Sequence, residues 1–219
     1  MLQHRNTQPS FPGPLPLASL IPSARIRLQS HLDSRLIADH VQPAHSWVRN
    51  FHNWLYCVAA GFIPSGSTFG AGYLSLKDTG GTVRNLAAAS YSLVVAGLVN
   101  NSNYGIVTGR GTSAESYDSY ALATPITHGT GANQLSHRAG SAISPGYTSG
   151  TLTWLSSFSR LFDNSSGSTI TVTETGIVCL ANNTSNYYLL CRDLLASSID
   201  VLNSGTLTVT YEISLTFPG

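Results

Sequence analysis

The residue types used in nucleophilic and acid–base catalysis are present, but their spacing matches no catalytic motif. Serine, histidine and aspartate all occur, yet the Gly-x-Ser-x-Gly sequence that exposes a nucleophilic serine at a strand-to-helix turn is absent. His128 and His137 are the only histidines beyond residue 61, and both lie in the glycine-rich segment Thr127–Gly140. We therefore expect loop histidines that bond the main chain, not a catalytic base.

Paired carboxylates are the next candidates, because glycoside hydrolysis needs two such groups about 5–10 Å apart. The nearest pairs are Glu115 with Asp118, and Glu174 with Asp193. Glu174 ends a predicted strand and Asp193 follows an arginine, so ion pairing on the surface accounts for both. No cluster of carboxylates or imidazoles indicates a metal site. The sequence thus predicts no enzyme, no catalytic residue, no metal and no cofactor or small-molecule substrate.

The three cysteines, Cys57, Cys179 and Cys191, are an odd number and show no Cys-x-x-Cys spacing, so neither a zinc site nor a disulfide framework is indicated. Cys179 and Cys191 flank a predicted turn at 181–186. A symmetric hairpin would place Cys179 opposite Tyr188, not opposite Cys191. We therefore expect free, buried thiols.

The charge content gives little reason to expect nucleic acid or membrane as a partner. Charged residues are 10% of the chain and the formal net charge is +1, whereas about 25% charged residues is usual in soluble domains. Arg25, Arg27 and Arg35 lack the interleaved aromatics of nucleic-acid binding surfaces. The longest apolar stretch, Leu86–Val99, is interrupted by polar residues and too short to span a bilayer, and no secretory leader is evident.

The elements that would position any site are strands, and the clearest is at 206–217. Its side chains alternate between apolar and polar at period two, which places one face against a core and the other against water. The apolar face holds Leu207, Val209, Tyr211, Ile213, Leu215 and Phe217. Glu212 is the only charge on the other face, which we expect to meet water.

From residue 62 onward the chain reads as short strands separated by Asn-, Asp-, Ser- and Gly-rich turns. The predicted strands are 72–77, 83–88, 91–99, 105–108, 119–122, 150–155, 158–162, 168–173, 176–180, 186–192 and 205–217. Many short strands with regular turns predict a mainly β, antiparallel β-sandwich or jelly-roll-like domain over 62–219. The stretch 109–149 is rich in loop-forming residues and is expected to form a long excursion on one face.

Residues 1–44 are predicted to form an extended, partly helical arm. Five of the ten prolines lie in residues 1–22, and proline fixes φ and removes a hydrogen-bond donor. A modest helical stripe follows, made of Ile26, Leu28, Leu32, Leu36 and Ile37.

A stronger helical stripe predicts an amphipathic helix over 45–61, with Pro43 before it and Gly61 after it. The stripe holds Trp47, Val48, Phe51, Trp54, Leu55 and Val58. It needs a large apolar partner: the β domain itself is the simplest one, and a neighbouring subunit is the alternative. The residues of arm and helix expected to bind partners are Pro12, Pro14, Pro16, Arg25, Arg27, Trp47, Phe51 and Trp54.

Several segments resemble structural proteins of tailed bacteriophage virions. They are Gly105-Ile-Val-Thr-Gly-Arg-Gly-Thr, Asp118-Ser-Tyr-Ala-Leu, Ile126-Thr-His-Gly-Thr-Gly-Ala-Asn-Gln-Leu135, Phe158–Gly176, Leu189-Leu-Cys-Arg-Asp-Leu-Leu195 and the Gly-Thr-Leu-Thr-Val-Thr-Tyr ending. The likeness covers about residues 105–217 and is a pattern of strands and turns, not an active-site motif. It implies a place in a virus particle without indicating which part.

The leading hypothesis is a non-enzymatic virion structural protein, capsid- or tail-associated, such as a decoration or minor structural protein. It would assemble with copies of itself and with other virion proteins, anchored by its N-terminal arm. The second hypothesis is a receptor- or glycan-binding module at a tail or fibre tip, which would use the tyrosines of the 109–149 loops. The third is a polysaccharide hydrolase, which an exposed carboxylate pair in an aromatic cleft would favour.

Overall fold

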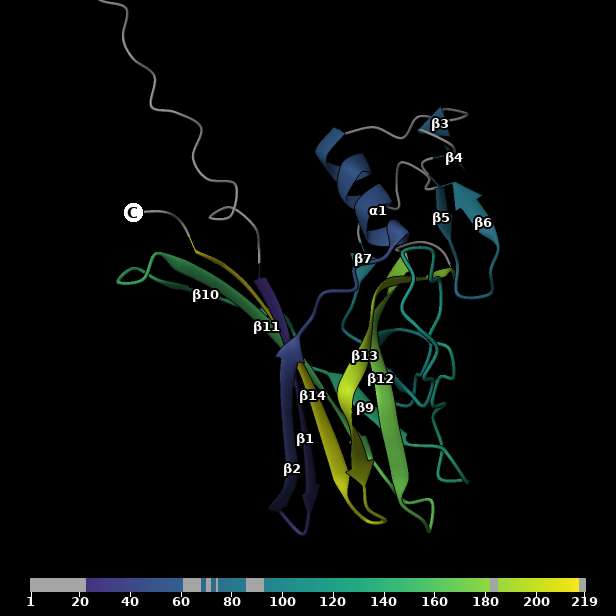
Figure 1. Ribbon diagram of the computed structural model, residues 1–219, viewed down its shortest axis with the longest axis vertical. Coiled ribbons are helices and arrows are strands. Elements are labelled where there is room, and N and C mark those ends of the chain that lie inside the picture. Colours follow the sequence, from purple (N-terminus) through teal and green to yellow (C-terminus); the bar gives the residue numbers. More distant parts are fainter. Residues whose placement is uncertain are drawn as a thin grey trace, which may run out of the picture.

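The computed structural model describes residues 23–60, 68–69, 72–73, 75–85, 93–181 and 185–216. Within this part the chain is mainly β, with antiparallel sheets and one helix (Figure 1). Two larger sheets contribute side chains to one hydrophobic core. The prediction of an antiparallel, mainly β protein is therefore confirmed.

The larger sheet has six strands, in the order β10-β11-β14-β1-β2 with β9 also pairing with β11. Its strands are β1 (Ser23–Leu32), β2 (Arg35–Pro43), β9 (Ser136–Gly140), β10 (Ser144–Thr148), β11 (Thr153–Asp163) and β14 (Thr206–Thr216). Strand β14 lies at its centre, between β1 and β11. The alternation seen in the sequence over 206–216 therefore belongs to a central strand, and its residues Leu207, Val209 and Tyr211 are fully buried.

The second sheet has four strands, in the order β13-β12-β7 with β8 also pairing with β12. They are β7 (Leu93–Val94), β8 (Gly105–Gly109), β12 (Ile170–Ala181) and β13 (Tyr187–Val201). Two small hairpins complete the strands: β3 (Thr68–Phe69) with β4 (Gly72–Tyr73), and β5 (Ser75–Lys77) with β6 (Val83–Asn85).

The helical interpretation of residues 26–37 is wrong, because these residues form the β1–β2 hairpin. Asp33 and Ser34 connect the two strands with positive φ values of 48° and 64°, a two-residue turn whose twist suits an antiparallel hairpin. Ile26 and Leu28 are fully buried because β1 pairs with β14 and points them into the core. The same residues satisfy a weak helical spacing, and long-range pairing decides between the two.

The helix predicted at 45–61 is confirmed as α1 (Arg49–Ala60). Its partner is the β domain: Trp47, Phe51 and Trp54 pack, partly buried, against the core. Asn50 fixes the helix in place, since its Nδ2 donates to the carbonyls of Lys77 (2.9 Å) and Leu189 (3.1 Å) and its Oδ1 accepts from the Lys77 N–H. Leu55, assigned to the apolar stripe, is instead 47% exposed, and the side chain of Val58 lies outside the described residues.

Several strand boundaries differ from the prediction. The segments 150–155 and 158–162 are one strand, β11, and 168–173 and 176–180 are one strand, β12. No strand forms at 119–122. The stretch 109–149, expected to be a loop excursion, also contributes β9 and β10 to the larger sheet.

Candidate functional site

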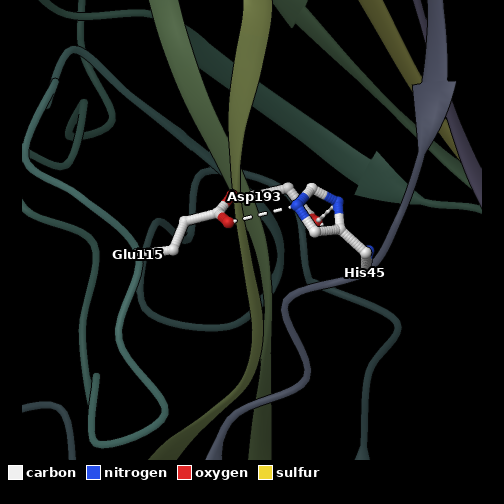
Figure 2. A group of neighbouring side chains, drawn as sticks. All are labelled: His45, Glu115 and Asp193. Carbon is white, nitrogen blue, oxygen red and sulfur yellow. Dashed lines mark hydrogen bonds and ion pairs between the residues drawn. The ribbon is translucent and has the colours of Figure 1, made fainter.

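Three ionisable side chains meet where the larger sheet leads into the helix. His45 lies between β2 and α1, Glu115 lies between β8 and β9, and Asp193 lies in β13. One ring nitrogen of His45 faces each carboxylate (Figure 2): Nε2 is 3.2 Å from Glu115 Oε2, and Nδ1 is 3.4 Å from Asp193 Oδ1. This group could not be predicted from local sequence patterns, because its members come from three distant parts of the chain.

Asp193 is the buried anchor of this group. Its Oδ1 accepts the backbone N–H groups of His45 (2.9 Å) and Ser46 (3.2 Å), and its Oδ2 accepts the thiol of Cys191 (2.8 Å). Burial raises the pKa of the Asp193 carboxyl above its ordinary value, and these hydrogen bonds oppose the rise. The expectation that Asp193 pairs on the surface is wrong, since its exposed fraction is 0%.

Glu115 and His45 form the accessible side of the group. The Glu115 side chain is 24% exposed and that of His45 is 60% exposed. The Leu194 N–H donates to Glu115 Oε1 at 2.6 Å, which fixes the carboxylate against β13. Both residues line an open hollow of about 740 Å³, whose other lining residues are Gln42, Pro43, Ala114, Leu194, Leu195 and Ala196. Small molecules and ions can thus approach the group from this side.

The second carboxylate of the predicted pair, Glu174, is also fully buried, and its partner is an arginine. Arg192 Nε donates to Glu174 Oε2 at 2.7 Å, and Glu174 also accepts backbone N–H groups of Gly111, Ala123 and Thr124. A Cβ at Gly111 would lie 2.4 Å from Glu174 Oε1, so glycine is required for this approach. The surface interpretation of Glu174 is therefore also wrong: it ties the 110–124 segment to the second sheet.

Arg160 is a further buried charge, and no carboxylate of the described residues pairs with it. Its guanidinium donates to five backbone carbonyls at 2.5–3.0 Å, those of Leu98, Asn101, Tyr104, Ile106 and Arg138. Burial lowers the pKa of Arg160 to about 10, so the side chain remains protonated at neutral pH. The guanidinium thus supplies hydrogen-bond donors to carbonyls of loops and strands that would otherwise lack a partner.

The two histidines of the 127–140 segment do bond the main chain. The His137 ring nitrogen Nδ1 lies 3.4 Å from the Asn101 carbonyl, and His128 Nδ1 accepts the His137 N–H at 3.0 Å. His137 is, however, a buried strand residue of β9 and not a loop residue. Burial, followed by the nearby charge of Arg160, lowers the pKa of His137 to about 4.

A different kind of surface lies at one end of the larger sheet. We call it the projecting end, and define it as β10 with residues 153–155 of β11 and 213–216 of β14. Figure 1 shows this end bending away from the second sheet and α1. Tyr147, Trp154 and Leu215 are cross-strand neighbours on it. Tyr147 is 58% exposed and Trp154 is 39% exposed.

The residues that the sequence singled out for partner binding are distributed as follows. Pro12, Pro14 and Pro16 lie outside the described residues. Arg25 pairs with Glu212, and Arg27 pairs with Asp39. Trp47, Phe51 and Trp54 contact the protein's own core, as described above. Glu115 and Asp118 do not form a pair, since Asp118 contacts Arg49 at 2.6 Å.

The cysteine predictions can be checked for two of the three residues. Cys179 and Cys191 are free and buried, and Cys179 lies opposite Tyr188, as predicted. Burial raises the pKa of Cys179 to about 12 and that of Cys191 well above its ordinary value. Both thiols therefore stay protonated at neutral pH and are poor nucleophiles.

Comparisons with known proteins find no match among family models, curated proteins or solved structures. Among the described residues, no helix has the length and apolar character needed to cross a membrane. Function must therefore be argued from the surfaces described above.

Proposed function

We propose that this chain is a non-enzymatic structural protein of a virus particle, which assembles through the projecting end of its larger sheet. The observation that carries the proposal is the apolar row Tyr147–Trp154–Leu215, in which Tyr147 and Trp154 are exposed and Leu215 is half-buried. The strand pairing places this row on the inward-facing side of the sheet. The apolar residues farther along the same face of β11 and β14 form the core. Side chains of this kind gain free energy when a neighbour covers them, at roughly 25 cal/mol per Å² of apolar surface.

Three further features support assembly. The outward side of the same end carries Leu155, which is 38% exposed, beside Ser214. Among the described residues, strand β10 is an edge strand without a charged residue, and apart from Pro145, which lacks an N–H, its backbone can pair with another strand. The low charge content, 10% of residues, limits repulsion between closely packed copies. A neighbouring copy of the chain is the occupant that this combination favours.

The proposal includes the finer fold and the place in the particle. The two larger sheets are taken to form a β-sandwich of the jelly-roll kind, a module that can be repeated in a shell or tail. The resemblance of residues 105–217 to virion proteins supports the viral setting. Residues 1–22 would act as an anchoring arm, now shorter than the 44 residues first predicted because β1 and β2 belong to the sheet.

The geometry gives less support to the hydrolase alternative. A glycosidase needs space between its carboxylates for the bond that it cleaves. In the His45 group the imidazole occupies that space, with one nitrogen toward each carboxylate (Figure 2). We therefore favour assembly over hydrolysis.

The experiment is light scattering coupled to size-exclusion chromatography, across a range of protein concentrations. We expect wild-type protein to self-associate and Trp154→Ser to weaken the association at least about tenfold, as removal of a central aromatic residue does in many interfaces. Leu161→Ser is the matched control, because Leu161 is a similarly exposed residue (37%) of the same strand outside the projecting end. Equal association of both variants would overturn the assigned surface.

The viral setting needs its own measurement. Purified particles from the genome that encodes the chain should contain it as a stoichiometric component by quantitative mass spectrometry. A variant lacking residues 1–22 should fold with the same circular dichroism spectrum but be incorporated at lower occupancy. Full occupancy of the truncated protein would contradict the anchoring role, and absence of the chain from particles would contradict the structural role.

A further inference from the structure

The group His45, Glu115 and Asp193 has a charge balance unlike that of the other buried carboxylates in the described part of the chain. Glu174 is fully buried and touches the guanidinium of Arg192 at 2.7 Å. Asp193, next to that arginine in sequence and equally buried, contacts no arginine or lysine among the described residues. Its basic neighbour within the described residues is the imidazole of His45. A buried carboxylate without a permanent cation is costly, so the group favours an additional positive charge.

The donor atoms of these three side chains are close enough to share one ion. One atom from each residue, an imidazole nitrogen and two carboxylate oxygens, can be chosen so that all lie within 4.8 Å of one another. Ligands around a tetrahedral Zn²⁺ at about 2.1 Å lie about 3.4 Å apart. The His45 side chain, which is 60% exposed, can make the remaining movement, whereas Glu115 and Asp193 are held by their hydrogen bonds.

The surroundings hold the two carboxylates as outer-shell partners do in metal sites. Leu194 N–H binds Glu115 Oε1, and the backbone N–H groups of His45 and Ser46 bind Asp193 Oδ1. A carboxylate offers about four acceptor positions, of which Glu115 uses one for Leu194 N–H and Asp193 uses three for His45 N–H, Ser46 N–H and the Cys191 thiol, so each keeps at least one for an ion. The open hollow beside His45 and Glu115 provides a path for an ion to enter. A defined donor set, supporting hydrogen bonds and an entry path are the checkable features of such a site.

We propose that His45, Glu115 and Asp193 form a binding site for a divalent transition-metal ion, with the hollow side left open to water. One imidazole and two carboxylates suit Zn²⁺, which accepts mixed nitrogen and oxygen ligands in a four-coordinate arrangement. Rotation of the His45 ring out of the space between the two carboxylates lets the ion bind there, where it joins the segment after β2, the 110–124 segment and β13. Its role is structural, because it crosslinks three parts of the chain that meet beside α1.

The test is a titration of the full-length, metal-free protein with ZnCl₂, measured by isothermal titration calorimetry. We expect one ion per chain in the wild type, and at least tenfold weaker binding in His45→Gln and Glu115→Gln. Both substitutions are at partly exposed side chains, so folding can be verified first by circular dichroism. Co²⁺ gives a second readout, since a four-coordinate site of this kind produces visible absorption bands that His45→Gln removes.

Thermal unfolding measures the crosslink itself. At an ion concentration 100 times the dissociation constant, we expect the Tm of the wild type to rise by about 5–10 °C. The same concentration should leave the Tm of His45→Gln within about 2 °C of its metal-free value.

Two control variants separate this site from other metal-binding groups. His52→Gln removes another exposed histidine, in α1, outside the group. Cys57→Ser removes a thiol that could itself bind zinc. Both controls should retain the single ion and the rise in Tm. Absence of binding to the wild type, or equal binding by wild type and His45→Gln, would overturn the proposal, as would loss of the ion in either control.

Discussion

The two ends of the larger sheet are built from the same strands and have opposite surroundings. Toward one end, Phe162 of β11 pairs with Leu207 of β14, and both side chains are fully buried. Toward the other end, Trp154 pairs with Leu215 on the same face of the same strands. Trp154 is 39% exposed and Leu215 is half-buried. Only the first end is covered by the second sheet (Figure 1).

Alternation of apolar and polar side chains therefore specifies a strand and its apolar face, but not whether another element covers that face. The hydrogen bonds of β11 and β14 continue without interruption from Thr153–Thr216 to Asp163–Thr206. Strands β11 and β14 therefore continue, with their apolar face, beyond the part of the sheet that the core covers. The exposed apolar residues Tyr147 and Trp154 at this end are available to a neighbour.

The charges differ between the two ends as well. The covered end contains Arg160, whose guanidinium is enclosed by backbone carbonyls. The projecting end adjoins Arg25, whose side chain is 64% exposed and pairs with Glu212. A buried charge depends on every one of its partners, whereas an exposed ion pair is replaced by water at little cost.

The largest difference in free energy of unfolding is expected between two single variants, Arg160→Met and Arg25→Met. Arg160→Met should lower the free energy of unfolding by about 3–5 kcal/mol, because two buried and three partly buried hydrogen bonds to carbonyls are lost. Arg25→Met should change it by less than about 1 kcal/mol. Urea unfolding followed by circular dichroism measures both. Similar losses in the two variants would remove the distinction between the ends.

A second matched pair tests the apolar face of β14. Leu207→Ala should cost about 2–5 kcal/mol of unfolding free energy, because it leaves a cavity in the core. Leu215→Ala should cost less than about 1 kcal/mol in dilute, monomeric protein, since water already reaches that position. The unfolding midpoint of Leu215→Ala should also lose any dependence on protein concentration that the wild type has. A large loss at Leu215 in the monomer would show that the projecting end is covered within one chain.

The smallest of the three effects concerns acid stability at the covered end. His137 has a pKa lowered to about 4 in the folded protein, from an ordinary value of 6.5. The unfolded state therefore binds more protons than the folded state between these values, so stability falls as the pH decreases through this window. By pH 4.5 the loss attributable to His137 is about 2.5 kcal/mol.

The measurement compares wild type with His137→Gln by urea unfolding at pH 7 and pH 4.5. Other groups titrate in both proteins, so the difference between the two pH-dependent losses isolates His137. The Gln variant should lose about 2.5 kcal/mol less than the wild type over this range. Equal losses would mean that His137 is accessible to protons in the folded state.

Some features could be predicted because they depend on local sequence. The last strand, the helix near 45–61 and the opposition of Cys179 and Tyr188 follow from short-range periodicity and turn composition. The β1–β2 hairpin was missed because its apolar residues also fit a helical spacing, and pairing of β1 with the distant β14 settles the choice. Local patterns carry no information about such long-range pairing.

The candidate sites were missed for the same reason. Glu174 and Asp193 look like surface carboxylates in sequence, since most carboxylates are exposed. Their burial depends on Arg192, on backbone N–H groups of distant segments, and on the closeness of Gly111. The group of His45, Glu115 and Asp193 likewise exists only once three distant segments meet.

The mainly β architecture and the amphipathic helix can be predicted from the amino-acid sequence, because side-chain periodicity and turn residues specify local structure over a few neighbouring positions. Which apolar side chains are buried, and which charged side chains form ion pairs, depends on the tertiary structure. Burial depends on which segments meet in space, and pairing between residues far apart in the chain sets that. Leu207 and Leu215 lie on one face of one strand, and only the arrival of the second sheet makes one a core residue and leaves the other at a surface.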